Sequence, residues 1–158
     1  MKLQFGFSFI GILFLLMLFV PNILWTKHMP QGYEDYAKKE PKPLVLLERI
    51  GEACSTCTIL FFHNPGSAHW LLAAALALML AYEYYWLRYF RSEKTMADFY
   101  SPLLGIPVPG ASLPVAAFFL LALYGNNLPL LISTIILAFG HIGIHLQHWK
   151  ELQARPPE

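Results

Sequence analysis

Long apolar stretches alternate with short polar segments along the chain. Five of the stretches are long enough for a helix that crosses a hydrocarbon core of about 30 Å, which takes roughly 20 mostly apolar residues. They are Phe5–Trp25, Pro43–Phe62, Ala68–Phe90, Leu103–Tyr124 and Leu128–His148. The pattern therefore predicts an all-α fold over residues 1–158: a single membrane domain, an integral membrane bundle of about five transmembrane helices.

The second stretch is the least regular, because Glu48, Arg49 and Glu52 interrupt it. The placement of Lys and Arg favours counting it as a span. With five spans, one side of the membrane receives nine of the eleven Lys and Arg residues, and the other side receives only Lys2. Since basic residues gather on the cytoplasmic side, we expect the N-terminus outside and the C-terminus in the cytoplasm.

The first stretch is predicted to be a retained helix and not a cleaved signal peptide. It has no small-x-small cleavage pattern before the segment 21–25. Its apolar run is also longer than the apolar core of a signal peptide, which has about 7–15 residues.

Composition agrees with a membrane protein: 56% of the residues are hydrophobic and 13% are charged. Soluble domains are usually about 45–50% apolar and about 25% charged. This balance argues against a disordered chain, a nucleic-acid-binding protein and most cytosolic enzymes. The sequence also has no phosphate-binding glycine loop and no serine-hydrolase motif.

Ionisable residues inside the predicted spans gather in the half of the membrane nearest the cytoplasm. Such groups are costly in a bilayer unless they are paired, hydrated or turned toward the bundle interior. The sequence therefore predicts a cytosol-facing polar site that binds or moves an ion or small solute. The candidate binding residues are Glu48, Arg49, Glu52, Glu83, Arg88, His141 and His145.

Residues three and four apart share a helix face, and two polar faces result. The face on the second span consists of Glu48, Glu52, Ser55 and Thr56. The face on the fifth span consists of Thr134, His141, His145 and His148, and we expect His148 to lie near the hydrated interface. Gly140 and Gly143 are expected to let a neighbouring helix approach closely.

His141 and His145 have a spacing that places two metal ligands on one helix face. A carboxylate from another helix would complete a site for a divalent metal, with Glu83 as the predicted third ligand and Glu52 or Glu48 as alternatives. Such a site suggests an alternative function, a membrane-embedded metal-dependent enzyme acting on a lipid or isoprenoid at the inner leaflet. A further alternative is an accessory subunit, in which Arg49 pairs with Glu83 or Glu52 only to hold helices together.

Two other motifs bear on the site. Cys54 and Cys57 have the C-x-x-C spacing, but they lie in the middle of a span, and we expect buried, inert thiols. The segment 105–114 holds three prolines and two glycines. It predicts either an irregular backbone beside the polar site or a helix that begins late, near Pro114.

Several short strings carry a resemblance: Pro21-Asn22 with Trp25-Thr26-Lys27, Glu48-Arg49-Ile50-Gly51-Glu52, Tyr85-Trp86-Leu87-Arg88-Tyr89-Phe90 and Gly140-His141-Ile142-Gly143-Ile144-His145. Together they resemble a group of small bacterial multi-pass membrane proteins that has no assigned activity. The resemblance implies a bacterial plasma membrane and assigns no catalytic residue. The expected partners are the lipid bilayer and a second copy of the chain in a homo-oligomer, with no nucleic acid.

Overall fold

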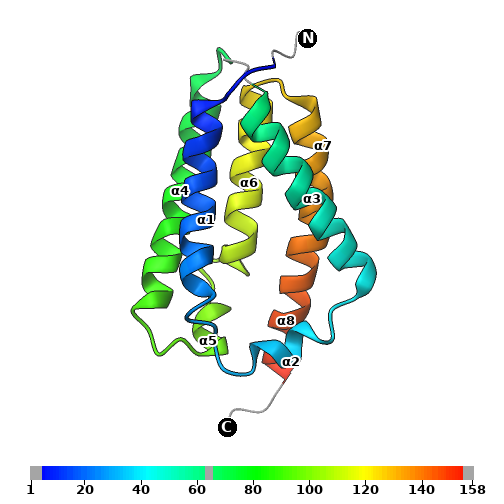
Figure 1. Cartoon of the computed structure of the whole chain (residues 1–158). Helices are drawn as coiled ribbons and strands as arrows, with labels where there is room; N and C mark the ends of the chain where they lie inside the picture. The colour runs from blue at the N-terminus through cyan, green and yellow to red at the C-terminus, as the bar shows by residue number, and fades with distance from the viewer. Residues whose placement is uncertain (1–4, 63–65, 155–158) are drawn as a thin grey trace.

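The computed structural model describes residues 5–62 and 66–154, and these form a bundle of helices (Figure 1). The long helices are α1 (Phe9–Trp25), α3 (Lys42–Phe61), α4 (His69–Phe90), α6 (Pro109–Tyr124) and the continuous succession of α7 (Leu128–Leu137), η1 (Ala138–Ile142) and α8 (Gly143–Ala154). Two short helices are α2 (Tyr33–Ala37) and α5 (Met96–Phe99). The described residues contain no β-strand beyond two isolated bridges, so the predicted all-α class is confirmed.

The long helices run alternately up and down the bundle (Figure 1). The main packing pairs are α4 with α6 and α3 with α7 and η1, whereas α1 packs more lightly against α3 and α4. The short helices α2 and α5 lie at the end of the bundle where α8 finishes, and we call this the α8 end. All connections that carry several Lys or Arg residues are at this end.

Among the described residues, two helices are long and apolar enough to cross a membrane by length and composition: His69–Phe90 and Leu128–Ala154, with 22 and 27 residues. Only 28% and 33% of their apolar windows are buried, so a large part of each window is exposed or only partly covered by the rest of the bundle. The helices α1 and α6 are apolar but have only 17 and 16 residues. The count of five spans, and its orientation, therefore stay predictions.

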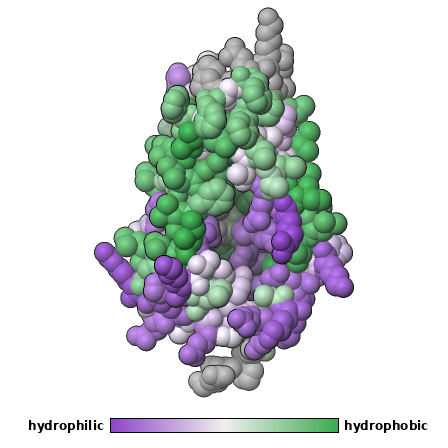
Figure 2. Space-filling view, in the orientation of Figure 1, coloured by the Kyte–Doolittle hydropathy of each residue, from purple (hydrophilic) through white to green (hydrophobic). Residues whose placement is uncertain are grey.

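The surface separates into an apolar body and a polar end. Figure 2 shows hydrophobic side chains over the upper part of the molecule and hydrophilic ones around the α8 end. Large exposed apolar residues occur on each long helix, among them Phe19 on α1, Ile50 on α3, Leu80 on α4, Phe119 on α6 and Phe139 on η1. Soluble proteins rarely expose continuous apolar surface on this scale.

The helix of the fourth predicted stretch, Leu103–Tyr124, begins later than the stretch itself. Residues 103–108 form an irregular turn, with positive φ at Leu104 (52°) and Val108 (44°), and α6 begins at Pro109. Proline suits the first position of a helix because its missing N–H would have no helical partner there. The helix thus starts before Pro114, and the irregular segment leads directly into it.

Candidate functional site

The site forms where α3 meets the helix Leu128–Ala154, and glycines make the approach possible. A Cβ added at Gly51 would lie 2.5 Å from Leu137 Cα, and one at Gly140 would overlap the backbone of Glu48. The expectation that Gly140 lets a neighbouring helix approach closely is therefore confirmed. Gly143 differs, because a Cβ there would make only an ordinary contact, 3.4 Å from a methyl group of Leu44.

A π-helical turn changes which residues face α3. Glu48 lies beside His141, with 2.5 Å between Oε1 and Nδ1, and the Ser55 hydroxyl donates to Ser133 Oγ at 3.1 Å. Seven residues of α3 therefore match eight residues of the opposite helix, because the π turn of η1 adds one residue to two turns. The predicted place of Thr134 on the histidine face is wrong: Ser133 takes it, and Thr134 Oγ1 has no hydrogen-bond partner among the described residues.

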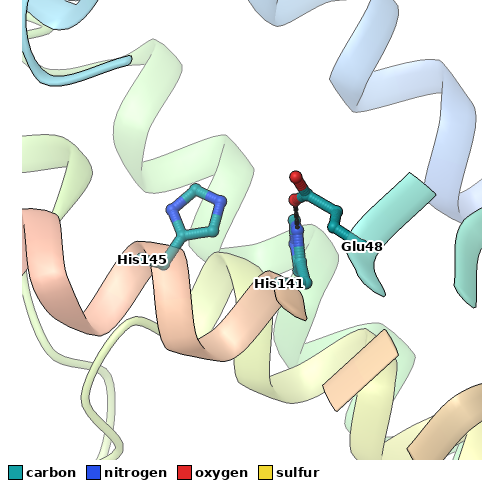
Figure 3. Close-up of side chains that lie close together, drawn as sticks. All are labelled: Glu48, His141 and His145. Carbon is teal, nitrogen blue, oxygen red and sulfur yellow. Dashed lines mark hydrogen bonds and ion pairs between the residues drawn. The ribbon is translucent and has the colours of Figure 1, made fainter. Parts of the chain in front are cut away.

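Glu48, His141 and His145 come together as predicted for a polar site (Figure 3). One ligand atom from each lies within 4.8 Å of the others, the only such group that the described residues form. The two imidazole rings have centroids 4.6 Å apart. The predicted third ligand was Glu83, and the structure places Glu48 there instead, because the π turn and Gly140 bring α3 and not α4 against His141.

Behind His145, a buried tyrosine joins it to a third histidine. Tyr100 Oη lies 3.1 Å from His145 Nδ1 and 2.9 Å from His148 Nδ1. Burial raises the pKa of the Tyr100 phenol well above its usual value, so the phenol keeps its proton. On the far side of His148, Nε2 lies 3.4 Å from Glu40 Oε1.

His148 is fully buried, which overturns the expectation of a hydrated interfacial residue. Edge-to-face contacts with Tyr33 and Tyr36 enclose its ring. These tyrosines come from α2, between the first two predicted spans. Burial also raises the pKa of Glu40, and the nearby carboxylate of Glu48 adds to this shift. The periodicity of the predicted spans carries no signal for residues of the connection between two spans.

A cavity of about 310 Å³ adjoins the site, and its volume lies near the lower limit for small-molecule pockets. Its polar lining includes Asn22, Glu52, Tyr82 and His141 from different helices, and its apolar lining includes Phe118. The lining described contains no Lys or Arg. Figure 2 shows the surface hollowed between α1 and α3.

A smaller space of about 30 Å³ connects this region with the histidines. It shares Asn22, Gly110 and His141 with the larger cavity and extends to Tyr100 and His145. The cavity and the group of Glu48, His141 and His145 therefore belong to one polar region of the bundle.

Three predicted site residues lie elsewhere. Arg88 donates to the backbone carbonyls of Pro102 (2.9 Å) and Ser101 (2.7 Å), and so holds the segment after α5. Arg49 is exposed and makes no hydrogen bond or ion pair with a described residue, so its predicted pairing with Glu83 or Glu52 is not found. Glu83 is half-buried on α4, outside the cavity lining and the Glu48 group.

Cys54 and Cys57 are exposed, which contradicts the prediction of buried thiols. The reason is the packed face of α3, which consists of Gly51, Ser55 and Ile59. Residues 54 and 57 lie on other faces of that helix, turned away from the bundle. They belong to neither the site nor its cavity.

No family model, curated protein or solved structure matches the chain. The resemblance to small bacterial multi-pass membrane proteins therefore stays a prediction, and function has to be argued from the geometry above.

Proposed function

We propose that this chain is a multi-pass protein of a bacterial plasma membrane, with five spans, an external N-terminus and a cytoplasmic C-terminus. The exposed apolar side chains on all five long helices support this proposal. With 17 residues, α1 is at the short end of the length that spans a bilayer, about 17–25 residues, and α6, with 16, is one residue shorter than that range. The basic connections at the α8 end support the orientation.

Within the bundle, the protein binds a small solute in the cavity beside His141. The observation that carries this proposal is the combination of about 310 Å³ of space with polar groups from several helices. Pockets for small molecules have this character, with mostly apolar walls and a few polar groups that orient the ligand.

The charge of the lining indicates the kind of solute. Glu52 contributes a carboxylate, and Asn22, Tyr82 and His141 contribute hydrogen-bonding groups. Because the described lining holds no cationic side chain, an anion would meet Glu52 without a counter-charge. A cationic solute, or a neutral one rich in hydrogen-bond donors, fits best.

Ligand-induced thermal shifts of the detergent-purified protein test the proposal. The panel would hold small organic ammonium ions, neutral polyols and carboxylate anions. We expect a cation or polyol at about 100 times its dissociation constant to stabilise the protein by about 2.7 kcal/mol. The shift should disappear in the Glu52→Gln/His141→Ala double variant and persist in the matched control Glu83→Gln.

If the double variant responds like the wild-type protein, the cavity is not the binding site. If no compound distinguishes the two proteins, and polar substitutions change only folding, the structural accessory subunit becomes the better description.

A second candidate function is a metal-dependent enzyme acting on a lipid or isoprenoid at the inner leaflet. The group of Glu48, His141 and His145 favours this candidate, because the group adjoins a cavity. That cavity opens on the side of the bundle, where the surface is hollowed between α1 and α3 (Figure 2). This candidate requires turnover of an apolar substrate in vesicles, and that turnover must depend on bound metal. Solute binding alone requires neither.

A further inference from the structure

We propose that Glu48, His141 and His145 bind a divalent transition metal ion, with Zn²⁺ as the reference ion. Two imidazole nitrogens and a carboxylate oxygen form a typical ligand set for zinc. This inference does not depend on the solute proposed above: the two sites share His141, but the ligand is different, and Glu48 and His145 do not line the larger cavity.

The ligand atoms are already near the required positions. Zinc binds nitrogen and carboxylate oxygen at about 2.0–2.2 Å, so two ligands of a tetrahedral site lie roughly 3.3–3.6 Å apart. The ligand atoms here lie within 4.8 Å of one another. Side-chain rotations that open the hydrogen bond between Glu48 Oε1 and His141 Nδ1 close the set around one ion, and the close approach of α3 at Gly140 places Glu48 beside His141.

The hydrogen bonds behind His145 select the tautomer that a metal needs. Tyr100 has one hydroxyl proton and two histidine neighbours, so it donates to one imidazole and accepts from the other. The carboxylate of Glu40 lies 3.4 Å from His148 Nε2 without hydrogen-bond geometry, and its negative charge favours a proton on that nitrogen. His148 Nδ1 then accepts the hydrogen bond from Tyr100.

It follows that His145 Nδ1 donates to Tyr100, and that His145 Nε2 keeps a free lone pair. Figure 3 shows one ring nitrogen of His145 pointing toward Glu48 and His141, while Nδ1 is the atom held by Tyr100. Metal-binding histidines usually donate their other N–H to an oxygen in this way, which fixes the ring and its tautomer. Tyr100 is thus a positioning residue for the metal site.

Three protein ligands leave one position of a tetrahedral zinc site open to water or another small ligand. His141 lines both cavities, so the group of ligands adjoins the solute-binding space. The site is therefore accessible without disruption of the helix packing.

The test is metal analysis of the full-length protein in detergent, after tag removal, treatment with a chelator, reloading with Zn²⁺ and buffer exchange. We expect roughly one zinc ion per wild-type chain and loss of zinc in His141→Ala/His145→Ala and in Glu48→Gln. The matched controls are Glu83→Gln, a carboxylate outside the group, and His69→Ala, an exposed histidine of α4. Both should retain zinc.

Tyr100→Phe provides a second variant that keeps the aromatic packing and removes only the hydroxyl. It should weaken zinc affinity about 10–100-fold, the usual effect of losing such a supporting hydrogen bond. In Co²⁺-loaded protein, the visible absorption bands should report the ligand set directly, and they should be absent in the double histidine variant.

Circular dichroism and size-exclusion chromatography establish that each variant is folded. The proposal is wrong if folded wild-type protein retains no more zinc than the folded double histidine variant. It is also wrong if Glu83→Gln loses as much zinc as Glu48→Gln. Solute-induced thermal shifts of zinc-free protein show separately whether the solute proposal holds.

Discussion

Gly140 and Gly143 are three residues apart on one helix, yet only Gly140 has a neighbour that excludes a side chain. The backbone of α3 at Leu44 and Glu48 occupies the space that a Cβ of residue 140 would need. At residue 143, the nearest atoms belong to the flexible Leu44 side chain. At the scale of single residues, the position of Glu48 relative to His141 therefore depends on the absence of one methyl group.

We predict that Gly140→Ala lowers the free energy of unfolding by about 1–3 kcal/mol, the usual cost of overpacking. Gly143→Ala is the matched control and should be neutral, or stabilising by about 0.5–1 kcal/mol, because alanine favours a helix over glycine. Denaturant unfolding in detergent, followed by circular dichroism, measures both. Equal effects of the two substitutions would contradict the close approach of α3.

At the scale of elements, α5 has only four residues, but its start is well stabilised. The Thr95 hydroxyl accepts from the Asp98 backbone N–H at 3.1 Å, and the Asp98 carboxylate accepts from the Thr95 N–H at 3.0 Å. This capping box holds Phe99 against Trp25, with ring centroids 5.6 Å apart. It also holds Tyr100 between the two histidines, so a short helix outside the five long ones supports the site.

We predict that Asp98→Ala costs about 1 kcal/mol of stability through loss of the cap. Burial alone would raise the pKa of the Asp98 carboxyl, but the hydrogen bonds that this carboxyl makes with Thr95 lower the pKa below its usual value. The stabilisation is therefore present at neutral pH, and it disappears as the pH falls through that lowered pKa.

Intrinsic tryptophan fluorescence during unfolding at neutral and acidic pH measures this dependence. The control is Asp35→Ala, which removes a pair with Lys38 whose side chains are both 70% exposed, so it should have little effect. A wild-type protein and an Asp98→Ala variant with equal stability at neutral pH would refute the capping role.

At the scale of the whole molecule, the basic connections and the histidine cluster lie at one end of the bundle, and the turn near Ser67 lies at the other. If the five long helices cross the membrane, this polarity sets the side from which metal and solute enter. We predict that they enter from the cytoplasm.

Labelling of single cysteines with a membrane-impermeant maleimide tests the orientation. In a background without Cys54 and Cys57, Ser67→Cys should react in intact cells whose outer membrane is permeabilised. Lys39→Cys should react only after the inner membrane is opened. Both residues are exposed, so burial does not explain a difference. The reverse pattern would mean that the site faces outward.

The five helices themselves could be predicted from the sequence, because burial or lipid contact of a helix needs a continuous apolar run. The predicted stretch Ala68–Phe90 and the observed helix His69–Phe90 differ by one residue. The stretch Leu128–His148 was short by six residues at its end, because α8 continues through mostly polar residues in which only Trp149 and Leu152 pack against the core. His141 and His145 share a face for local reasons, and the sequence was sufficient for that.

Tertiary structure alone decided which other residues join those histidines. The sequence predicts Glu83 beside these histidines, with Glu52 or Glu48 as alternatives, and the contact of Gly140 with α3 brings Glu48 there instead. Ser133 replaces Thr134 because a π turn shifts the register by one residue, which a regular helical period does not anticipate. Tyr100 lies beside the histidines because the connection between α4 and α6 packs there. Helical periodicity does not predict how such a connection packs.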